Sequence, residues 1–230
     1  MSKLIKTKTG KQIEETIKQS GKPFAFALLS QVPIVSAFAT FCNEFVNSKW
    51  QDRIEKWQEE VIKKFSQLDE KTETKIRESQ NFASILATAQ QNAIKDIEED
   101  KVKFYVASVV NAIKNEDIDN VKTHMFLNAL SDFTILHIKM LEYFKTEHKY
   151  LHKNSSNVFG VLSRIEEIKA HLEKDCPEII MDESLSKLVL IELFNAQMLK
   201  IQNLEDINIS TNIKKQTTIF GDEFLNFISI

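Results

Sequence analysis

Apolar residues recur at helical spacing along most of this chain, and the pattern predicts a series of amphipathic helices. The clearest stretch begins at Trp50, where steps of three or four residues separate successive apolar positions. These positions are Trp50, Ile54, Trp57, Val61, Phe65 and Leu68. Charged residues of both signs lie between them, so one face of this helix is expected to be buried and the other solvated.

Two more helices of the same kind are expected before residue 115. A polar connector at 69–80 leads into them, and the acidic run 115–120 marks their end. The apolar positions are Phe82, Ile85, Leu86, Ala89, Ala93 and Ile97 in the first, and Val102, Tyr105, Val106, Val109, Val110 and Ile113 in the second. Together with the stretch from Trp50, they predict an N-terminal helical bundle.

After residue 121 the predicted helices become shorter. One is expected at 121–130, a second starts from a cap at Ser131 and Asp132, and a later one starts near Asp182. The apolar positions of that later helix are Leu185, Leu188, Ile191, Phe194 and Met198. Their spacing of three or four residues predicts one apolar face.

The C-terminal tail alternates apolar and polar residues, unlike the segments before it. Segments 199–203 and 215–220 are predicted to be two strands of a hairpin, and Gly221 opens a terminal helix. The hairpin closes in the pattern Thr218, Gly221, Phe224, Leu225 and Ile228. An apolar helix, a polar hairpin and this closing pattern together resemble a winged-helix domain over residues 124–230. The resemblance implies a fold and says little about function.

The chain is therefore predicted to be mainly α, with three parts along its length. These are a basic amphipathic arm at 1–22, a helical bundle at 23–120 that includes a long apolar segment at 24–46, and a winged-helix-like domain at 121–230. Only 4 glycines and 3 prolines occur among 230 residues, whereas sheet-rich and phosphate-cradling folds need glycine at turns and close approaches. This composition favours long helices joined by polar turns.

A second resemblance lies in the middle of the chain. A helix pair bearing acidic residues and lysine is followed there by a segment of the Phe-x-x-x-Leu-x-x-Leu type. The matching residues are Glu98, Glu99, Asp100, Lys101, Ala107, Asn111, Phe126, Leu130, Phe133, His137 and Leu141. They resemble bacterial abortive-infection alpha-type proteins and related uncharacterised proteins. This resemblance implies a role in phage defence or on a mobile element.

The stretch 24–43 contains no charged residue. Its length allows a membrane span, but Ser30, Gln31 and Pro33 near its middle disfavour insertion. Three interpretations stay open: a buried helix or helical hairpin bent at Pro33, a membrane-embedded or interfacial segment with the basic arm on the cytoplasmic side, and a signal peptide. The residues expected to contact a membrane or a partner are Phe24, Phe26, Leu28, Phe38, Phe41 and Phe45.

Charge and cysteine content narrow the classes of partner and compartment. The net charge is -3, which gives no general attraction to nucleic acid or anionic lipid. Cys42 and Cys176 have no neighbouring Cys or His at ligand spacing, so a disulfide scaffold is not expected and a reducing compartment fits. We therefore expect a cytoplasmic protein, at the inner face of the membrane if the apolar segment is interfacial.

No pattern of catalytic residues is recognisable. Gly10 and Lys11 lack the remainder of a phosphate-binding loop. His148 and His152 share a helical spacing that suits a metal, but they lie in a lysine- and tyrosine-rich stretch and are better explained as a surface pair. The sequence thus predicts no enzyme activity, no metal, no cofactor and no small-molecule substrate.

The winged-helix resemblance raises the question of DNA binding. Base and phosphate contacts need Lys, Arg, Asn or Gln on the exposed face of a recognition helix, here expected at 184–200. The candidates are Lys187, Asn195 and Lys200 on the helix, and Lys214 and Lys215 on the wing. Glu183 and Glu192 lie among them and no basic stripe exists, so protein interaction is favoured over DNA binding.

The preferred hypothesis is a non-enzymatic interaction or scaffold protein, acting as an accessory or effector in phage defence. It would bind a protein partner, with a homo-oligomer as one option, and the expected interface residues are Trp50, Ile54 and Trp57. Two alternatives remain open. One is a DNA-binding transcriptional regulator that uses the winged-helix module, and the other is a membrane-associated effector acting through residues 24–46.

Overall fold

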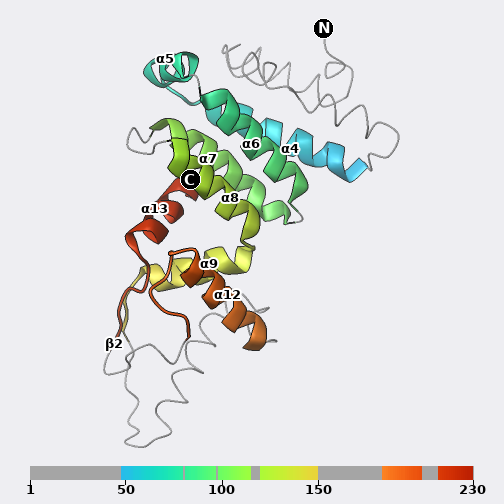
Figure 1. The fold of residues 1–230 in the computed structure, drawn as a ribbon. Helices are drawn as coiled ribbons and strands as arrows, with labels where there is room; N and C mark the ends of the chain where they lie inside the picture. The colour runs from blue at the N-terminus through green and yellow to red at the C-terminus, as the bar shows by residue number, and fades with distance from the viewer. Residues whose placement is uncertain are drawn as a thin grey trace, which may run out of the picture. The chain divides into compact units, whose positions relative to one another are not determined.

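The computed structural model of the chain is mainly helical, which confirms the mainly α part of the predicted fold class (Figure 1). The predicted winged-helix hairpin is not shown by the described part of the chain. The residues that the structure describes are 48–79, 81–96, 98–114, 120–149, 183–203 and 212–229. Contacts divide the chain into two compact units. Unit 1 runs to Ser131 and also contains the chain end from Ile228, and unit 2 is Asp132–Phe227. The apolar segment 24–46 and the basic arm lie outside the described residues.

Unit 1 is a set of packed helices. Its described elements are α4 (Ser48–Phe65), α5 (Glu70–Glu78), α6 (Phe82–Lys95), the short 3-10 helix η2 (Glu99–Lys101), α7 (Val102–Lys114) and α8 (Asn120–Asp132). Helices α4, α6 and α7 pack against one another, and α5 packs against α7 (Figure 1). None of the described helices is both long and apolar enough to cross a bilayer.

The core of unit 1 follows the predicted apolar positions. On α4 these are Trp57, Val61 and Phe65, which are buried together with Leu68 just after the helix. The predicted positions of α6 and α7 are buried in the same way, apart from Ile113, which is half-buried, and Ile97, which lies outside the described residues. On each of these helices the spacing of the apolar residues was enough to identify positions that are buried.

The polar connector predicted at 69–80 is instead mostly helical, because α5 occupies Glu70–Glu78. The Asp69 carboxylate caps this helix by accepting a hydrogen bond of 2.7 Å from the backbone N–H of Thr72. Ile76 is buried and anchors the helix to the rest of unit 1. A single apolar residue among charged ones gives no periodic signal, so the sequence pattern missed this helix.

Helix α8 belongs to unit 1, although the predicted boundary at 120/121 assigned it to the C-terminal domain. The Asn92 side chain on α6 donates a hydrogen bond of 3.4 Å to the backbone carbonyl of Leu127. The Tyr105 hydroxyl on α7 lies 3.5 Å from the carbonyl of Leu130. Both contacts join α8 to the preceding helices, and the division falls after Ser131.

Unit 2 combines three described helices with short extended segments. Its described elements are α9 (Ile135–Lys145), β1 (His148–Lys149), α12 (Glu183–Asn195), β2 (Asn212–Ile213) and α13 (Ile219–Ile228), whose last residue falls in unit 1. Helix α9 packs against α12 (Figure 1). The predicted cap of α9 at Ser131 and Asp132 is wrong, because these residues end α8 and the N-cap is Thr134.

The predicted hairpin of 199–203 with 215–220 is not present as a strand ladder in the described residues. One antiparallel bridge joins Leu199 to Thr217, and β1 pairs with β2. Ile219 and Phe220 are helical, because Thr218 starts α13: its hydroxyl oxygen accepts a hydrogen bond of 3.0 Å from the backbone N–H of Gly221.

Helix α12 ends in a tight left-handed turn. Gln197 has a φ of 59°, a conformation that favours glycine. The N–H of Gln197 donates to the carbonyl of Phe194, and the N–H of Met198 donates to the carbonyl of Leu193. These two bonds form a Schellman motif that ends the helix. The Thr218 hydroxyl then donates a hydrogen bond of 2.6 Å to the carbonyl of Gln197, which ties this turn to the start of α13.

Candidate functional site

Helix α12 exposes apolar side chains on its outer face. The side chains that it buries are Ser186, Val189, Leu190 and Leu193. We define the outer face of α12 by its exposed residues, which are Ser184, Leu185, Lys187, Leu188, Ile191, Glu192 and Asn195. Leu188 and Ile191 are 50% and 41% exposed. Apolar residues at such exposure, next to one another on one helix, are typical of an interaction surface.

The prediction for this helix placed the apolar face on the wrong side. Leu185, Leu188 and Ile191 are exposed, whereas Met198 is buried beyond the end of the helix. The buried positions Val189 and Leu190 lie four and three residues before buried Leu193, and these three residues form a second apolar stripe. Because α12 is apolar on both sides, periodicity could not say which side faces the core.

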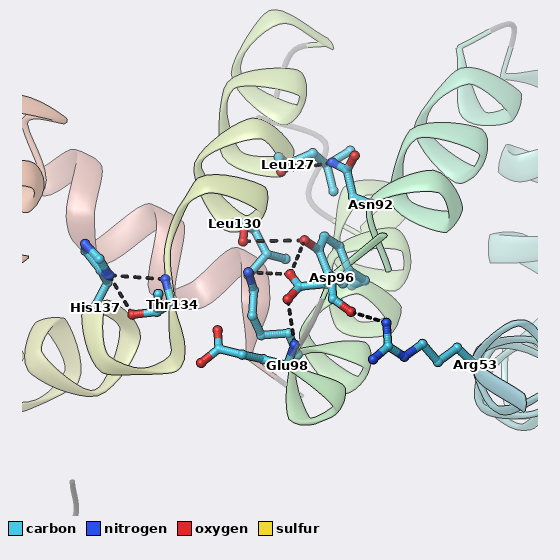
Figure 2. A network of polar contacts seen from close by, with 10 residues as sticks. Arg53, Asn92, Asp96, Glu98, Leu127, Leu130, Thr134 and His137 are labelled. Atoms are coloured by element: carbon cyan, nitrogen blue, oxygen red, sulfur yellow. Dashed lines mark hydrogen bonds and ion pairs between the residues drawn. The ribbon is translucent and has the colours of Figure 1, made fainter. Parts of the chain in front are cut away.

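The buried side chain of His137 contacts one residue of the outer face of α12. His137 of α9 lies with its Nε2 2.6 Å from Oε2 of Glu192 on α12. Its other ring nitrogen, Nδ1, accepts a hydrogen bond of 3.1 Å from the backbone N–H of Thr134 (Figure 2). A backbone N–H can only donate, so Nδ1 carries no proton and Nε2 donates to the carboxylate. His137 is therefore neutral in this arrangement, and the Glu192 carboxylate is its acceptor.

Aromatic contacts fix the ring of His137. Phe133 stacks on it with ring centroids 5.0 Å apart and an interplanar angle of 2°. Phe133 also meets Phe224 edge to face at 5.8 Å. Stacked and edge-to-face rings of this kind stabilise one arrangement of the side chains. The Thr134 hydroxyl lies 2.9 Å from Nδ1, but the three-residue spacing makes this a local cap of α9 and not a nucleophile with its base.

A second polar cluster lies at the start of α13. The Asp222 carboxylate accepts a hydrogen bond of 2.6 Å from the Thr217 hydroxyl and forms an ion pair with Lys215. Partial burial by itself raises the pKa of Asp222. The hydrogen bonds from Lys215 and Thr217 and the charges of Lys215 and Lys145 outweigh this effect, so the pKa of Asp222 lies below its ordinary value of 3.8.

Replacing Lys215 by Met is expected to raise the pKa of Asp222. A carboxylate with a lowered pKa in the folded state stabilises the fold above the pKa of the unfolded chain, and this stabilisation is lost as the pH falls through the folded pKa. The Lys215→Met variant should therefore be less stable than the wild type above about pH 4. In strong acid the two proteins should have nearly the same free energy of unfolding. Carbon-13 NMR of the carboxyl group measures the pKa directly. Lys214→Met, at a lysine that the structure does not pair with Asp222, is the control and should leave it unchanged.

The predicted DNA-binding residues do not form one basic surface. Lys187 and Asn195 are exposed on α12, and Lys200 and Lys214 are exposed beyond it. Lys215 is bound to Asp222. Two of these five residues share the outer face of α12 with a glutamate and three apolar side chains. The structure thus places the predicted residues on the surface of unit 2, in surroundings that are not uniformly basic.

The remaining predicted site residues fall elsewhere. Trp57 is 0% exposed and packs in the core of unit 1, so its prediction as an exposed interface anchor is wrong for this structure. Trp50 and Ile54 lie on α4, and their side chains are outside the described residues. The residues predicted to touch a membrane or a partner also lie outside them: Phe24, Phe26, Leu28, Phe38, Phe41 and Phe45.

Unit 1 contains a buried polar network that the sequence pattern did not indicate (Figure 2). The Asp96 carboxylate forms an ion pair with Lys101, which is 2% exposed, and accepts a hydrogen bond of 3.0 Å from the Tyr105 hydroxyl. The same carboxylate also accepts a hydrogen bond of 3.0 Å from the backbone N–H of Glu98. Arg53 of α4 donates a hydrogen bond of 2.9 Å to the Asp96 carbonyl. The network joins α4, α6 and α7.

Within this network Lys101 is buried, whereas Arg53, Asp96 and Glu98 are half-buried, and the contacts hold α4, α6 and α7 together. Lys101, Phe126, Leu130 and Phe133, which carry part of the abortive-infection resemblance, are all buried. Asn111, which also belongs to that set, donates a hydrogen bond of 2.6 Å to the backbone carbonyl of Ser229. Several residues of the resemblance therefore hold the fold, and the resemblance stays a prediction.

No family model matches this chain, and neither a curated protein nor a solved structure shows significant similarity to it. Among the residues that the structure describes, no group of three or more His, Cys, Asp or Glu is arranged to hold a metal ion. The outer face of α12, with its three exposed apolar side chains, is the candidate site that the described residues offer.

Proposed function

We propose that this chain is a non-enzymatic scaffold protein that binds a protein partner through the outer face of α12. The observation that carries the proposal is the exposure of Leu188 and Ile191 at the centre of that face. Burying such side chains against a partner is favourable by about 25 cal/mol per Å² of apolar surface. The flanking Lys187, Glu192 and Asn195 supply the polar rim that a protein interface has.

The arrangement of unit 2 supports a winged-helix-like module. Helix α9 is followed by β1, and α12 is followed by segments that pair antiparallel. The stretch 212–217 pairs with β1 through β2 and with Leu199 through Thr217. The N–H of Lys200 also donates to the carbonyl of Gln216. In this interpretation α12 stands in the position of the recognition helix, which is the surface that such a module presents.

Protein binding is favoured over DNA binding because of the side chains in that position. Base reading needs hydrogen-bonding side chains at the centre of the recognition helix. Here the centre is Leu188 and Ile191, with Glu192 beside them. The negative charge of Glu192 opposes a phosphate backbone, and the net charge of -3 gives no compensating attraction. The proposed role as an accessory or effector in bacterial phage defence comes from the abortive-infection resemblance alone.

Co-purification from the native host, followed by mass spectrometry, tests the proposal. The wild-type chain should retain a specific protein, and the Leu188→Glu/Ile191→Glu variant should lose at least about nine tenths of it. Both substitutions are at exposed positions, so circular dichroism should be unchanged. Met125→Glu is the matched control, because Met125 is an exposed apolar residue on α8 in unit 1.

DNA binding is measured on the same variants. Duplex retention at moderate salt that is lost in Lys200→Glu/Lys214→Glu and kept in Leu188→Glu/Ile191→Glu would overturn the proposal in favour of the regulator hypothesis.

A further inference from the structure

We infer that the partner on the outer face of α12 is a second copy of this chain, packed with the two α12 helices parallel. This inference rests on the proposed function and names the partner class of the same site. It is carried by the spacing of the exposed residues and by the placement of two opposite charges among them.

The exposed residues follow the heptad repeat of a coiled coil. Ser184, Leu188, Ile191 and Asn195 are separated by four, three and four residues, which is the spacing of alternating d and a positions. All four are exposed. They form one narrow line along α12, with Leu188 and Ile191 in the middle. Leu188 and Ile191 are the apolar a and d positions of this line, and a second helix that packs on them would bury both side chains.

The charges beside this line select the orientation of the second copy. In the same register Lys187 is a g position and Glu192 is the following e position, five residues later. In a parallel pair, a g residue of one helix faces the next e residue of the other, so Lys187 of each copy meets Glu192 of its partner. In an antiparallel pair, g faces g and e faces e. Lys187 would then face a lysine or Phe194, and no opposite charges would meet.

The geometry of His137 makes Glu192 suitable for this ion pair. His137 is neutral, because its Nδ1 accepts from the Thr134 N–H, and it donates to Oε2 of Glu192. The hydrogen bond holds the carboxylate in one orientation. Glu192 remains on the surface, with 46% of its side chain exposed. A fixed acid loses less side-chain entropy on forming an ion pair with a second copy.

Asn195 favours an assembly of two helices over a larger one. An asparagine at an a position pairs with its own copy across a parallel dimer and disfavours larger assemblies. Leu188 at a and Ile191 at d would by themselves favour larger bundles, so Asn195 is the residue that restricts the number of chains. Helix α12 has 13 residues, which is less than two heptads, so the association is expected to be weak and dependent on concentration.

Sedimentation equilibrium on the full chain over a wide concentration range tests the inference. The mass should rise from 26.6 kDa toward twice that value. Leu188→Glu should remain monomeric throughout, and Met125→Glu should behave as wild type. Lys187→Glu should weaken association about tenfold, because two attractive pairs become repulsive. Adding Glu192→Gln, which can still accept from His137, should recover most of that loss.

Cysteine cross-linking tests the orientation. In a chain with Cys42→Ser and Cys176→Ser, Leu188→Cys alone should form a disulfide dimer, since a parallel seam places each a residue opposite its own copy. Cross-linking that needs both Leu188→Cys and Ile191→Cys would indicate antiparallel helices and overturn the inference. A chain that stays monomeric at every concentration also overturns it. If its capture of a host protein still depends on Leu188, the proposed function stands without the second copy.

Discussion

Replacing Gly221 by Ala is expected to destabilise the protein by about 3 kcal/mol. A Cβ built on Gly221 lies 2.3 Å from the carbonyl oxygen of Met198 and 3.1 Å from its carbonyl carbon. Both contacts are with backbone atoms, which cannot move aside as a flexible side chain can. Inside a helix, Gly→Ala normally stabilises by up to about 1 kcal/mol, so the expected effect has the opposite sign. Chemical unfolding followed by circular dichroism measures it.

The control for this substitution is Ile219→Ala on the same helix. Ile219 is 80% exposed, so the change should alter the unfolding free energy by less than about 0.5 kcal/mol. A Gly221→Ala protein as stable as wild type would mean that α13 does not approach Met198 this closely.

Replacing Asp96 by Ala is expected to cost about 3–5 kcal/mol of stability. The ammonium group of Lys101 would remain buried without this carboxylate, and the Tyr105 hydroxyl would lose its nearest acceptor. Removing one partner of a buried ion pair lowers the stability more than replacing both charged side chains by apolar ones. The Asp96→Ala/Lys101→Met protein should therefore be more stable than the sum of the two single substitutions allows, by about 2 kcal/mol.

Two further variants make this double-mutant cycle specific. Tyr105→Phe removes one hydrogen bond and should cost about 1 kcal/mol. Lys103→Met, at an exposed lysine two positions from Lys101, should change stability by less than about 0.5 kcal/mol. If the effects of Asp96→Ala and Lys101→Met simply add, the two side chains do not act as a buried pair.

The buried positions of α4, α6 and α7 were predictable because apolar residues recur on these helices at helical spacing. On α4 that spacing gave the buried positions Trp57, Val61 and Phe65 correctly. The same reasoning failed on α12, which is apolar on two sides. Only the neighbouring helix decides that Val189 is buried while Leu188 is exposed. Local spacing contains no information about that neighbour.

The polar contacts were less predictable than the core. His137 and Glu192 are distant in sequence, and no local pattern relates them. Asp96 and Lys101 are close in sequence, yet charges interleaved in this way normally indicate a solvated surface. They pair because Asp96 follows the end of α6 and Lys101 ends the 3-10 helix η2, where packing against α7 encloses the lysine.

Gly221 shows that a residue can be singled out for the wrong reason. The sequence predicted it at the opening of a terminal helix, where it would let the chain leave the hairpin sharply. In the structure it lies within the first turn of α13, where a Cβ would clash with the backbone of Met198. Close approach between backbones depends on tertiary packing, so a turn was the only explanation available from the sequence.

The left-handed turn at Gln197 has a consequence for α12 as a whole. The helix is held at two separate points: near its centre by the hydrogen bond from His137 to Glu192, and at its end by the hydrogen bond from Thr218 to Gln197. Rolling α12 about its own axis would exchange Leu188 and Ile191 for the buried stripe, but it would break both bonds. The two bonds therefore keep the apolar side of α12 that carries Leu188 and Ile191 exposed to solvent.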